Sequence, residues 1–510
     1  MIIITHIKGE YVVKAHDSNN KDIDVLNTNP TQALLELGKR FPNKWIVWCE
    51  DSLTNHVDLS KIKNTLHHNR MMISDLSLQN PIPLDIHYIE ESPFLKVVKD
   101  VLYPTWQMSS TVGAIHGGIL SQLQGQVKEG INLDYALNII ARSCQSMGLL
   151  CYHASLFNKT LPDDSITYNT SFNPYEFVAK TFKKKWVVFL FLCHVIFEKR
   201  FPIFSFIKGM LTTKEAIKLK INEVAIKSTN TFKQNASVDV IIPTMGRSNY
   251  LYDVLKDFEK QTHLPEKIII VEQNPEPDST TDLDFITTET WPFKIEHSFI
   301  HETGACNARN LALAQTTADW VFFADDDIRF DNKVLEEILK KIQGYSASCL
   351  AVSCLQQNEN KVFKHPTQWN SFPSGASMVL GTLSRKLKFN TAYEHGYGED
   401  ADYGMQLRNL GVDILYHPDV DLLHLKAPVG GFRQKISQPW ESEEMIPKPS
   451  PTVMLYRLKH STLTQLKGYK LRLFLRQLNQ KKPLHLFRFV KHFKKRWNNA
   501  VKWAKVIDKR

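Results

Sequence analysis

ADWVFFADDDIRF, residues 318–330, places an apolar strand pattern directly before three consecutive aspartates. Adjacent carboxylates repel one another, so three in a row are costly unless a cation neutralises them. Residues i and i+2 of an extended chain share a face, so Asp325 and Asp327 can point together at one metal ion while Asp326 points elsewhere. Oxygen ligands favour Mg²⁺ or Mn²⁺, with substrate phosphates in the open coordination positions. The alternative is a helix N-cap, for which one aspartate would serve.

Strand and helix patterns alternate on both sides of this stretch, from residue 237 to about residue 425. This rhythm predicts an α/β fold with a mostly parallel sheet flanked by helices. Such sheets bind ligands beyond the carboxyl ends of their strands, which is where the aspartates lie. The strand patterns are at 237–244, 267–273, 293–300 and 320–324, and the helical patterns are at 250–262, 306–317 and 332–342.

A series of motifs follows the same order as the predicted elements: PTMGR (243–247), VEQNPEPD (271–278), GACNARN (304–310), ADDD (324–327), GYGEDADYGMQLRNLG (396–411) and LLHL (422–425). Together they resemble the family 2 glycosyltransferases, whose catalytic domain has the GT-A fold. The resemblance covers roughly residues 237–430. It implies a metal-dependent transfer of a sugar, with inversion, from a nucleotide-diphosphate sugar to a saccharide or lipid-linked acceptor. Among nucleotide-sugars, a UDP-sugar is the favoured donor. The implied process is the synthesis of cell-surface polysaccharide or lipopolysaccharide.

The resemblance also implies roles for single residues at matching positions. Asp325, Asp327 and His424 match metal ligands that hold Mn²⁺ or Mg²⁺ on the donor diphosphate. Asp400, within the pair Glu399-Asp400, matches the catalytic base. The residues predicted to form the substrate-binding site are Pro243, Thr244, Arg247, Glu272, Arg309, Asn310, Asp326, Gly375, Ala376 and Arg433.

Several of these residues have a structural alternative. Glu399 and Asp400 can cap the helix that follows them, although the preceding Gly-Tyr-Gly, which lets backbone approach a ligand, favours a functional role. His424 lies in an apolar strand pattern and can be a buried core histidine. Glu272 departs from the Asp-Asp-Gly-Ser pattern of the family, so the nucleobase stays open. The turn at 373–379 can be a plain buried turn.

Elementary chemistry agrees with the implied reaction. A nucleotide diphosphate leaves with charge on its phosphates, which a divalent cation and an arginine stabilise. The acceptor hydroxyl loses a proton as it attacks, and a carboxylate within hydrogen-bond reach can take it. Two separate acidic clusters, at 325–327 and 399–402, suit a metal and a base on opposite sides of the sugar.

The first half of the chain resembles the second in pattern. KWIVWCEDSL (44–53) matches DWVFFADDDI (319–328), and 111–120 and 132–153 follow as their counterparts do. We infer an internal duplication, with coincidental similarity of two α/β patterns as the alternative. In the first copy no acid matches the catalytic base, so we expect it to bind no nucleotide-sugar. The predicted domains are a degenerate GT-A-like domain (1–165), a basic helical connector (166–236), the catalytic domain (237–450) and a basic amphipathic helical tail (451–510).

The last 50 residues contain 15 Lys and Arg and one acid, and the whole chain has a net charge of +10. The apolar residues of this tail recur at helical spacing opposite a basic face, which predicts a helix in an anionic membrane interface. Nucleic-acid binding and packing on the catalytic domain are the alternatives, and we expect no nucleic-acid partner. The apolar positions are Leu486, Phe489, Val490, Phe493, Trp497, Val501 and Ala504.

The remaining composition bounds the location and the class of the protein. The longest apolar run, Trp186–Phe197, is shorter than the ~20 residues of a spanning helix, and seven scattered cysteines without CxxC fit a reducing compartment. We expect a cytoplasmic enzyme, peripheral on the inner face of the plasma membrane. The alternatives are a nucleotidyltransferase that makes nucleotide-sugars and a non-catalytic carbohydrate- or membrane-binding protein.

Overall fold

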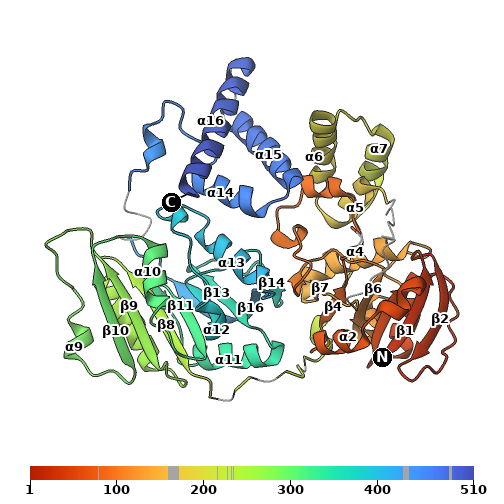
Figure 1. The fold of residues 1–510 in the computed structure, drawn as a ribbon, viewed down its shortest axis with the longest axis horizontal. Helices are drawn as coiled ribbons and strands as arrows, with labels where there is room; N and C mark the ends of the chain where they lie inside the picture. Colours follow the sequence, from red (N-terminus) through yellow and green to blue (C-terminus); the bar gives the residue numbers. More distant parts are fainter. Residues whose placement is uncertain are drawn as a thin grey trace. The chain divides into compact units, whose positions relative to one another are not determined.

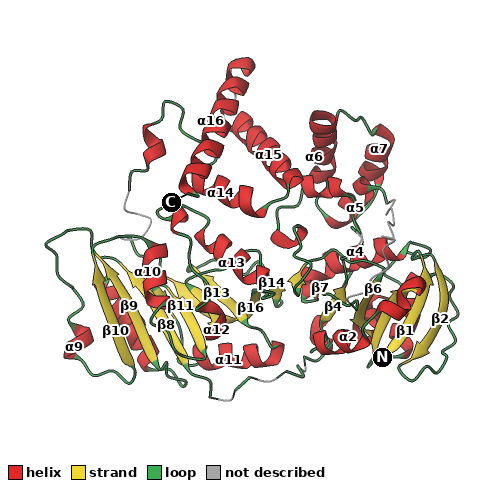
Figure 2. Cartoon of the chain, in the orientation of Figure 1, coloured by secondary structure: helices red, strands yellow, loops and turns green. Residues whose placement is uncertain are grey.

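The computed structural model describes residues 1–78, 80–158, 172–214, 216–226, 228–230, 232–233, 235–428, 436–481 and 485–509 (Figure 1). The chain divides into two compact units. Unit 1 comprises Met1–Asn230 and Ser461–Leu475, and unit 2 comprises Thr231–His460 and Arg476–Arg510. Both units combine helices and strands (Figure 2), so the expected α/β class is confirmed.

The sheet of unit 2 has the order β10-β9-β8-β11-β15-β13-β16-β12, and β14 pairs with β16. The run β10, β9, β8 and β11 is parallel, whereas β15 is antiparallel to both of its neighbours. Strands β9 and β11 are buried along their whole length, as their continuous apolar sequences require. The bounds are β8 Val238–Thr244, β9 Lys267–Gln273, β10 Lys294–Ile300, β11 Trp320–Ala324, β12 Ile328–Arg329, β13 Cys349–Leu355, β14 Thr367–Gln368, β15 Ala376–Leu380 and β16 Leu415–His424.

Helices connect these strands and cover the sheet (Figure 2). Helix α8 buries Leu251, Val254, Leu255 and Phe258, an i, i+3, i+4, i+7 stripe that an amphipathic helix turns toward a core. It carries the chain from β8 to the parallel strand β9, which needs such a crossover. The helices of unit 2 are α8 Ser248–Glu259, α9 Phe285–Thr288, α10 Ala305–Leu313, α11 Val334–Tyr345, α12 Gly381–Ser384, α13 Glu399–Asn409, α14 Pro451–His460 and α16 Leu486–Ile507. Helix α15, Leu463–Lys481, belongs mostly to unit 1.

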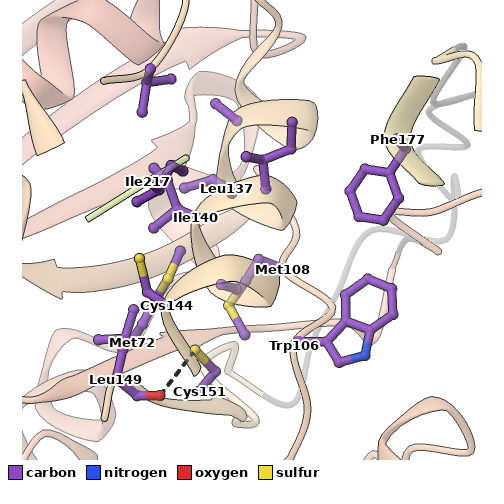
Figure 3. Close-up of a cluster of buried hydrophobic side chains, with 14 of the residues drawn as sticks. Met72, Trp106, Met108, Leu137, Ile140, Cys144, Leu149, Cys151, Phe177 and Ile217 are labelled. Atoms are coloured by element: carbon purple, nitrogen blue, oxygen red, sulfur yellow. Dashed lines mark hydrogen bonds between the residues drawn. The ribbon is translucent and has the colours of Figure 1, made fainter. Parts of the chain in front are cut away.

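Unit 1 contains a second sheet, of order β2-β1-β3-β6-β4-β7-β5. Its core gathers Trp106, Met108, Leu137 and Ile140, which all lie in one buried cluster (Figure 3). The strands are β1 Ile2–Ile7, β2 Tyr11–Asp17, β3 Trp45–Glu50, β4 Met71–Ser74, β5 Tyr103–Pro104, β6 Val112–His116 and β7 Leu150–His153. The helices are α1 Pro30–Arg40, α2 Leu59–Thr65, α3 Gly117–Leu123, α4 Leu133–Cys144, α5 Pro174–Thr181, α6 Lys185–Cys193 and α7 Ile203–Leu211.

The two sheets share a connection pattern. The strands β1, β3, β6, β4, β7 and β5 have the same chain order and the same parallel or antiparallel pairings as β8, β11, β15, β13, β16 and β14. In that alignment Asp134 is the second residue of α4 and Asp400 the second residue of α13. The sequence comparison, which left the base position of the first copy without an acid, is therefore corrected at Asp134.

Two predicted segments are organised differently from expectation. The predicted connector, residues 166–236, supplies α5, α6 and α7 to unit 1, and Phe177, Val187 and Leu190 are part of its buried core. Residues 159–171 lie outside the described part of the chain. The segment is part of unit 1 rather than a separate connector, because α5 and α6 bury apolar residues in the core of that unit.

The predicted membrane face of α16 is also largely covered. Phe493, Trp497 and Ala504 are buried, and α16 packs along α14. The N-terminal turns stay open, where Leu486 is 54%, Phe487 94% and Val490 44% exposed. Packing on the catalytic unit, the alternative raised for this helix, therefore holds for most of its length. Among the described residues, none of the helices combines the length and apolar content that spanning a bilayer requires.

Candidate active site

A cavity of about 650 Å³ lies in unit 2, where β8 and β11 reach their carboxyl ends. Most residues predicted for the site line it, although they come from segments up to about 180 positions apart. Those residues are Pro243, Thr244, Arg247, Arg309, Asp325, Asp326, Asp327, Gly375, Ala376, Glu399, Asp400 and His424.

The three aspartates after β11 have different surroundings. Asp326 is buried, and its carboxylate accepts hydrogen bonds from Thr244 Oγ1 (2.7 Å) and Arg247 Nη1 (2.6 Å). Burial raises the pKa of Asp326 to about 6, against the charge of Arg247. Asp325 keeps a side chain that is 35% exposed and lies 3.4 Å from Arg309 Nη2. Only Asp326 is thus tied to the β8 loop by short hydrogen bonds.

Asp327 is held by groups from the end of β16. Its Oδ1 lies 3.3 Å from His424 Nε2, and its Oδ2 accepts the backbone N–H of Ala427 at 2.8 Å. Burial opposes ionisation, but these two hydrogen bonds and the charge of Arg247 lower the pKa of Asp327. Its carboxylate is therefore ionised throughout the neutral range.

A metal ion fits one corner of the cavity. Asp325, Asp327 and His424 each offer a ligand atom, and these atoms lie within 4.8 Å of one another. Two carboxylate oxygens and one imidazole nitrogen suit Mn²⁺ or Mg²⁺, with room for substrate oxygens in the remaining positions. The predicted ligands are therefore together in space.

The second acidic cluster opens α13. Asp400 Oδ2 accepts the backbone N–H of Ser374 at 3.3 Å, while Oδ1 is buried without a hydrogen-bond partner among the described residues. Burial raises the pKa of Asp400, and the nearby charge of Arg309 opposes this. Burial and then Asp400 raise the pKa of Glu399 to about 7. A carboxylate with an elevated pKa and a free oxygen in a cavity can accept a proton.

Arg309 stands between the two acidic clusters. Its side chain is 9% exposed, its guanidinium lies over the ring of Phe389 at 5.5 Å, and Asp400, Asp325 and Glu399 act on it by charge. Within the described chain, its Nε and Nη1 have no hydrogen-bond partner. A buried cation with unused donors is suited to bind a ligand oxygen.

Two described residues that were predicted for the site, Glu272 and Asn310, are not among those that line the cavity. Glu272, in β9, accepts hydrogen bonds from Thr281 Oγ1 (2.6 Å) and the backbone N–H of Asp282, and its pKa is lowered because these bonds and His297 outweigh burial. Asn310 bridges both backbone groups of Phe389 at 2.8 Å, which is a structural role. Arg433 lies outside the described residues.

Sequence reasoning missed other lining residues. Gln273 faces the cavity and accepts the backbone N–H of Gly304, and Glu394 accepts those of Cys306 and Asn307 at the start of α10. Gly304 has a φ of 152°, and a Cβ there would lie 2.3 Å from the Glu394 carboxyl carbon. The signal was the glycine before the ARN segment. The reason for a glycine at this position could not be read from the sequence, because Glu394, which it contacts, is 90 positions away.

The chain was compared with known proteins. Residues 239–402 match the model of the glycosyl transferase family 2. Similar solved structures include TarS 1–349 of S. aureus in complex with UDP (20% identity, 38% of this chain and 61% of that chain, TM-score 0.32). They also include TarS 1–349 of S. aureus in complex with UDP-GlcNAc (15% identity, 54% of this chain and 90% of that chain, TM-score 0.35). A third is GalNAc-T7 with UDP, GalNAc and Mn²⁺ (11% identity, 40% of this chain and 48% of that chain, TM-score 0.30). Among curated proteins no sequence matches the chain.

The family match spans the strand ends, the three aspartates and the Glu399-Asp400 pair that together form the cavity. Residues 239–402 of unit 2, which carry these features, are therefore similar to the glycosyl transferase family 2.

Proposed function

We propose that the protein is a metal-dependent, inverting glycosyltransferase that uses a UDP-sugar and transfers the sugar to a saccharide or lipid-linked acceptor. We assign it to the synthesis of cell-surface polysaccharide or lipopolysaccharide. One observation carries the proposal: a single cavity holds a metal-binding triad on one wall and a carboxylate with an elevated pKa on another.

The proposed reaction is one displacement at the anomeric carbon. The bond from the acceptor oxygen to this carbon forms as the bond to the diphosphate oxygen breaks, which inverts the configuration. Asp400 accepts the proton of the acceptor hydroxyl, and Arg309 donates to the diphosphate. Mn²⁺ or Mg²⁺ held by Asp325, Asp327 and His424 would supply Lewis-acid stabilisation of the leaving diphosphate.

Unit 1 is, in this proposal, a duplicated copy that has lost its donor site. The shared strand order supports it, and so does one hydrogen bond: Ser110 N–H donates to Asp134 at 2.7 Å, as Ser374 N–H does to Asp400. Glu50, the last residue of β3, corresponds to Asp325 at the end of β11 and already accepts the backbone N–H of Lys8 at 2.9 Å. Its carboxylate is thus occupied by the chain itself, which leaves acceptor binding or a structural role for unit 1.

The proposed location is peripheral, on the inner face of the plasma membrane. The basic tail supports this, because a positive surface is attracted to anionic lipids. Because Phe493, Trp497 and Ala504 of α16 are buried, this face offers less membrane contact than the sequence predicted. We therefore place most of the membrane contact on another surface.

The function is tested with Asp400→Asn. We expect UDP with Mn²⁺ to stabilise both wild type and this variant in a thermal-shift assay with UDP, GDP, dTDP and CDP, by about 2.7 kcal/mol at ~100 times the dissociation constant. Turnover of a panel of UDP-sugars falls about 10²–10⁴-fold only in the variant. Asp419→Asn, an exposed aspartate in the same unit, is the control. Full activity of Asp400→Asn would refute the assigned base, and no stabilisation by any nucleotide would refute the donor site.

A further inference from the structure

Helix α7 exposes an apolar stripe in unit 1. Phe204 is 91% exposed, Leu211 78%, Ile203 51% and Ile207 47%, and Phe201 just before the helix is 66% exposed. Positions 203, 207 and 211 are four residues apart, so their side chains lie along one face. Large apolar side chains gathered on one surface mark an interaction site. We call these five residues the α7 stripe.

The opposite face of α7 is fixed, so the helix does not turn the stripe inward. A Cβ on Gly209 would lie 2.6 Å from Tyr175 Cβ, which shows how closely α7 approaches α5. The Phe206 ring lies 4.6 Å from that of Phe191 in α6. The stripe is therefore presented outward by packing rather than by fraying.

The surroundings of the stripe are basic. Lys199 and Arg200 precede it, Lys208 lies within α7, and Lys183–Lys185 begin the neighbouring helix, all of them exposed. Three acids lie among these bases and each is paired: Glu198 and Asp85 with Arg200, and Glu176 with Lys208 at 2.8 Å. The combination is an apolar stripe inside a rim of net positive charge.

We propose that the α7 stripe docks this protein into the interface of an anionic lipid bilayer. The stripe enters the acyl boundary while the lysines contact the headgroups, which is how a short amphipathic helix binds a membrane. With 9 residues, α7 is about 14 Å long, half the thickness of the hydrocarbon layer, so it lies in the interface and does not span. The positive rim favours lipid phosphates over an apolar protein partner. This inference rests on the peripheral location in the proposed function and names the surface responsible.

Vesicle co-sedimentation of the full chain tests the proposal. The probes are vesicles of phosphatidylcholine alone and of phosphatidylcholine with phosphatidylglycerol. The variant is Phe204→Asp/Ile207→Asp/Leu211→Asp, and the matched control is Leu26→Asp, because Leu26 is 89% exposed in the same unit. We expect wild type and control to sediment with the anionic vesicles only, and the triple variant to bind at least about tenfold more weakly.

Additional measurements make each outcome decisive. The substituted side chains are exposed, so the melting temperature and the stabilisation by UDP and Mn²⁺ are expected to stay unchanged, and Phe204→Ser is the milder variant if they do not. Unchanged vesicle binding of the folded triple variant, or no binding by wild type, would overturn the proposal and leave glycosyl transfer untouched. Loss of binding in Phe487→Asp alone would assign the contact to α16 instead. A change of oligomeric state in the triple variant, with vesicle binding retained, would assign the stripe to a protein partner.

Discussion

Gly375→Ala tests the metal site through a residue that is not itself a ligand. The pairing of β11 with β15 sets Ala324 opposite Ala376, which brings Gly375 against Asp325. A Cβ at Gly375 would lie 2.0 Å from Asp325 Oδ2 and 2.3 Å from its carboxyl carbon. The φ of Gly375 lies outside the left-handed region, so alanine adds a methyl group without backbone strain.

The size of the effect follows from this distance. Ordinary contact begins at 3.4 Å, so the carboxylate oxygen has to retreat by at least 1.4 Å, the difference between 3.4 and 2.0 Å. A metal ligand tolerates about 0.2 Å, and disturbing the support of a ligand costs about 10–100-fold in metal affinity, or about 1.4–2.7 kcal/mol. Asp325 is 35% exposed and has room to move, so the stability of the fold is expected to change little.

The assay is UDP-sugar turnover as a function of Mn²⁺ concentration, together with calorimetry of Mn²⁺ and UDP binding. Gly344→Ala is the control, because this glycine lies in α11 with no atom within 4 Å of the added Cβ. The expected result is a higher Mn²⁺ requirement in Gly375→Ala alone. An unchanged Mn²⁺ requirement in a folded Gly375→Ala protein would refute the assignment of Asp325 as a ligand.

Three further outcomes follow from the site. Chelation with EDTA abolishes turnover and Mn²⁺ or Mg²⁺ restores it, whereas turnover that survives EDTA contradicts metal dependence. Because Asp400 accepts a proton only when ionised, kcat/KM falls as pH drops through the apparent pKa of the Glu399–Asp400 pair. Burial raises the pKa of Asp400 and Arg309 opposes this rise, so Arg309→Gln is expected to move the acidic limb of the pH profile to higher pH. A move to lower pH would contradict this role of Arg309. Burial would raise the pKa of Asp402, but the hydrogen bond and charge of His460 at 2.7 Å outweigh burial and lower it. The interaction between Asp402 and His460 therefore stabilises the fold above the unfolded pKa of ~3.9, and this stabilisation is lost as pH falls through the folded pKa of Asp402. Urea denaturation of Asp402→Asn should show a loss of about 1 kcal/mol at pH 7 that disappears in acid, and equal losses at both pH values would contradict this.

The sequence predicted residues that the structure brings to one cavity, because several of them lie next to the ends of strands. Asp325, Asp327 and Asp400 sit at the ends of elements whose type the apolar pattern already predicts, so topology alone brings them together. Glu272 shows where this reasoning stops. Side chains alternate along a strand, and Gln273, one position later, is the residue of β9 that lines the cavity. A one-residue choice of face is set by tertiary packing, which a single strand pattern does not encode.

The helices outside the catalytic domain were harder to interpret for a different reason. An amphipathic pattern predicts that a face is covered but does not identify what covers it. Trp497 of α16 is buried against its own unit, whereas Phe204 of α7 remains open, although both lie in basic, aromatic segments. The sequence therefore predicted that the chain has a surface for lipid, but placed it on the wrong helix if the α7 stripe is that surface.

A strand can end in three like charges because each carboxylate pairs with a basic side chain: Asp325 with Arg309, and Asp326 and Asp327 with Arg247. Asp326 is tied to Arg247 and Thr244, which holds the β8 loop against the end of β11 before any ligand arrives. Asp327 is oriented by His424 and has a long, 3.4 Å contact with Arg247, and Asp325 has a contact of the same length with Arg309. A divalent cation at Asp325 and Asp327 would compete with these two long arginine contacts and not with the short hydrogen bonds of Asp326. Arg309, whose Nε and Nη1 have no hydrogen-bond partner among the described residues, would then be available to a donor diphosphate.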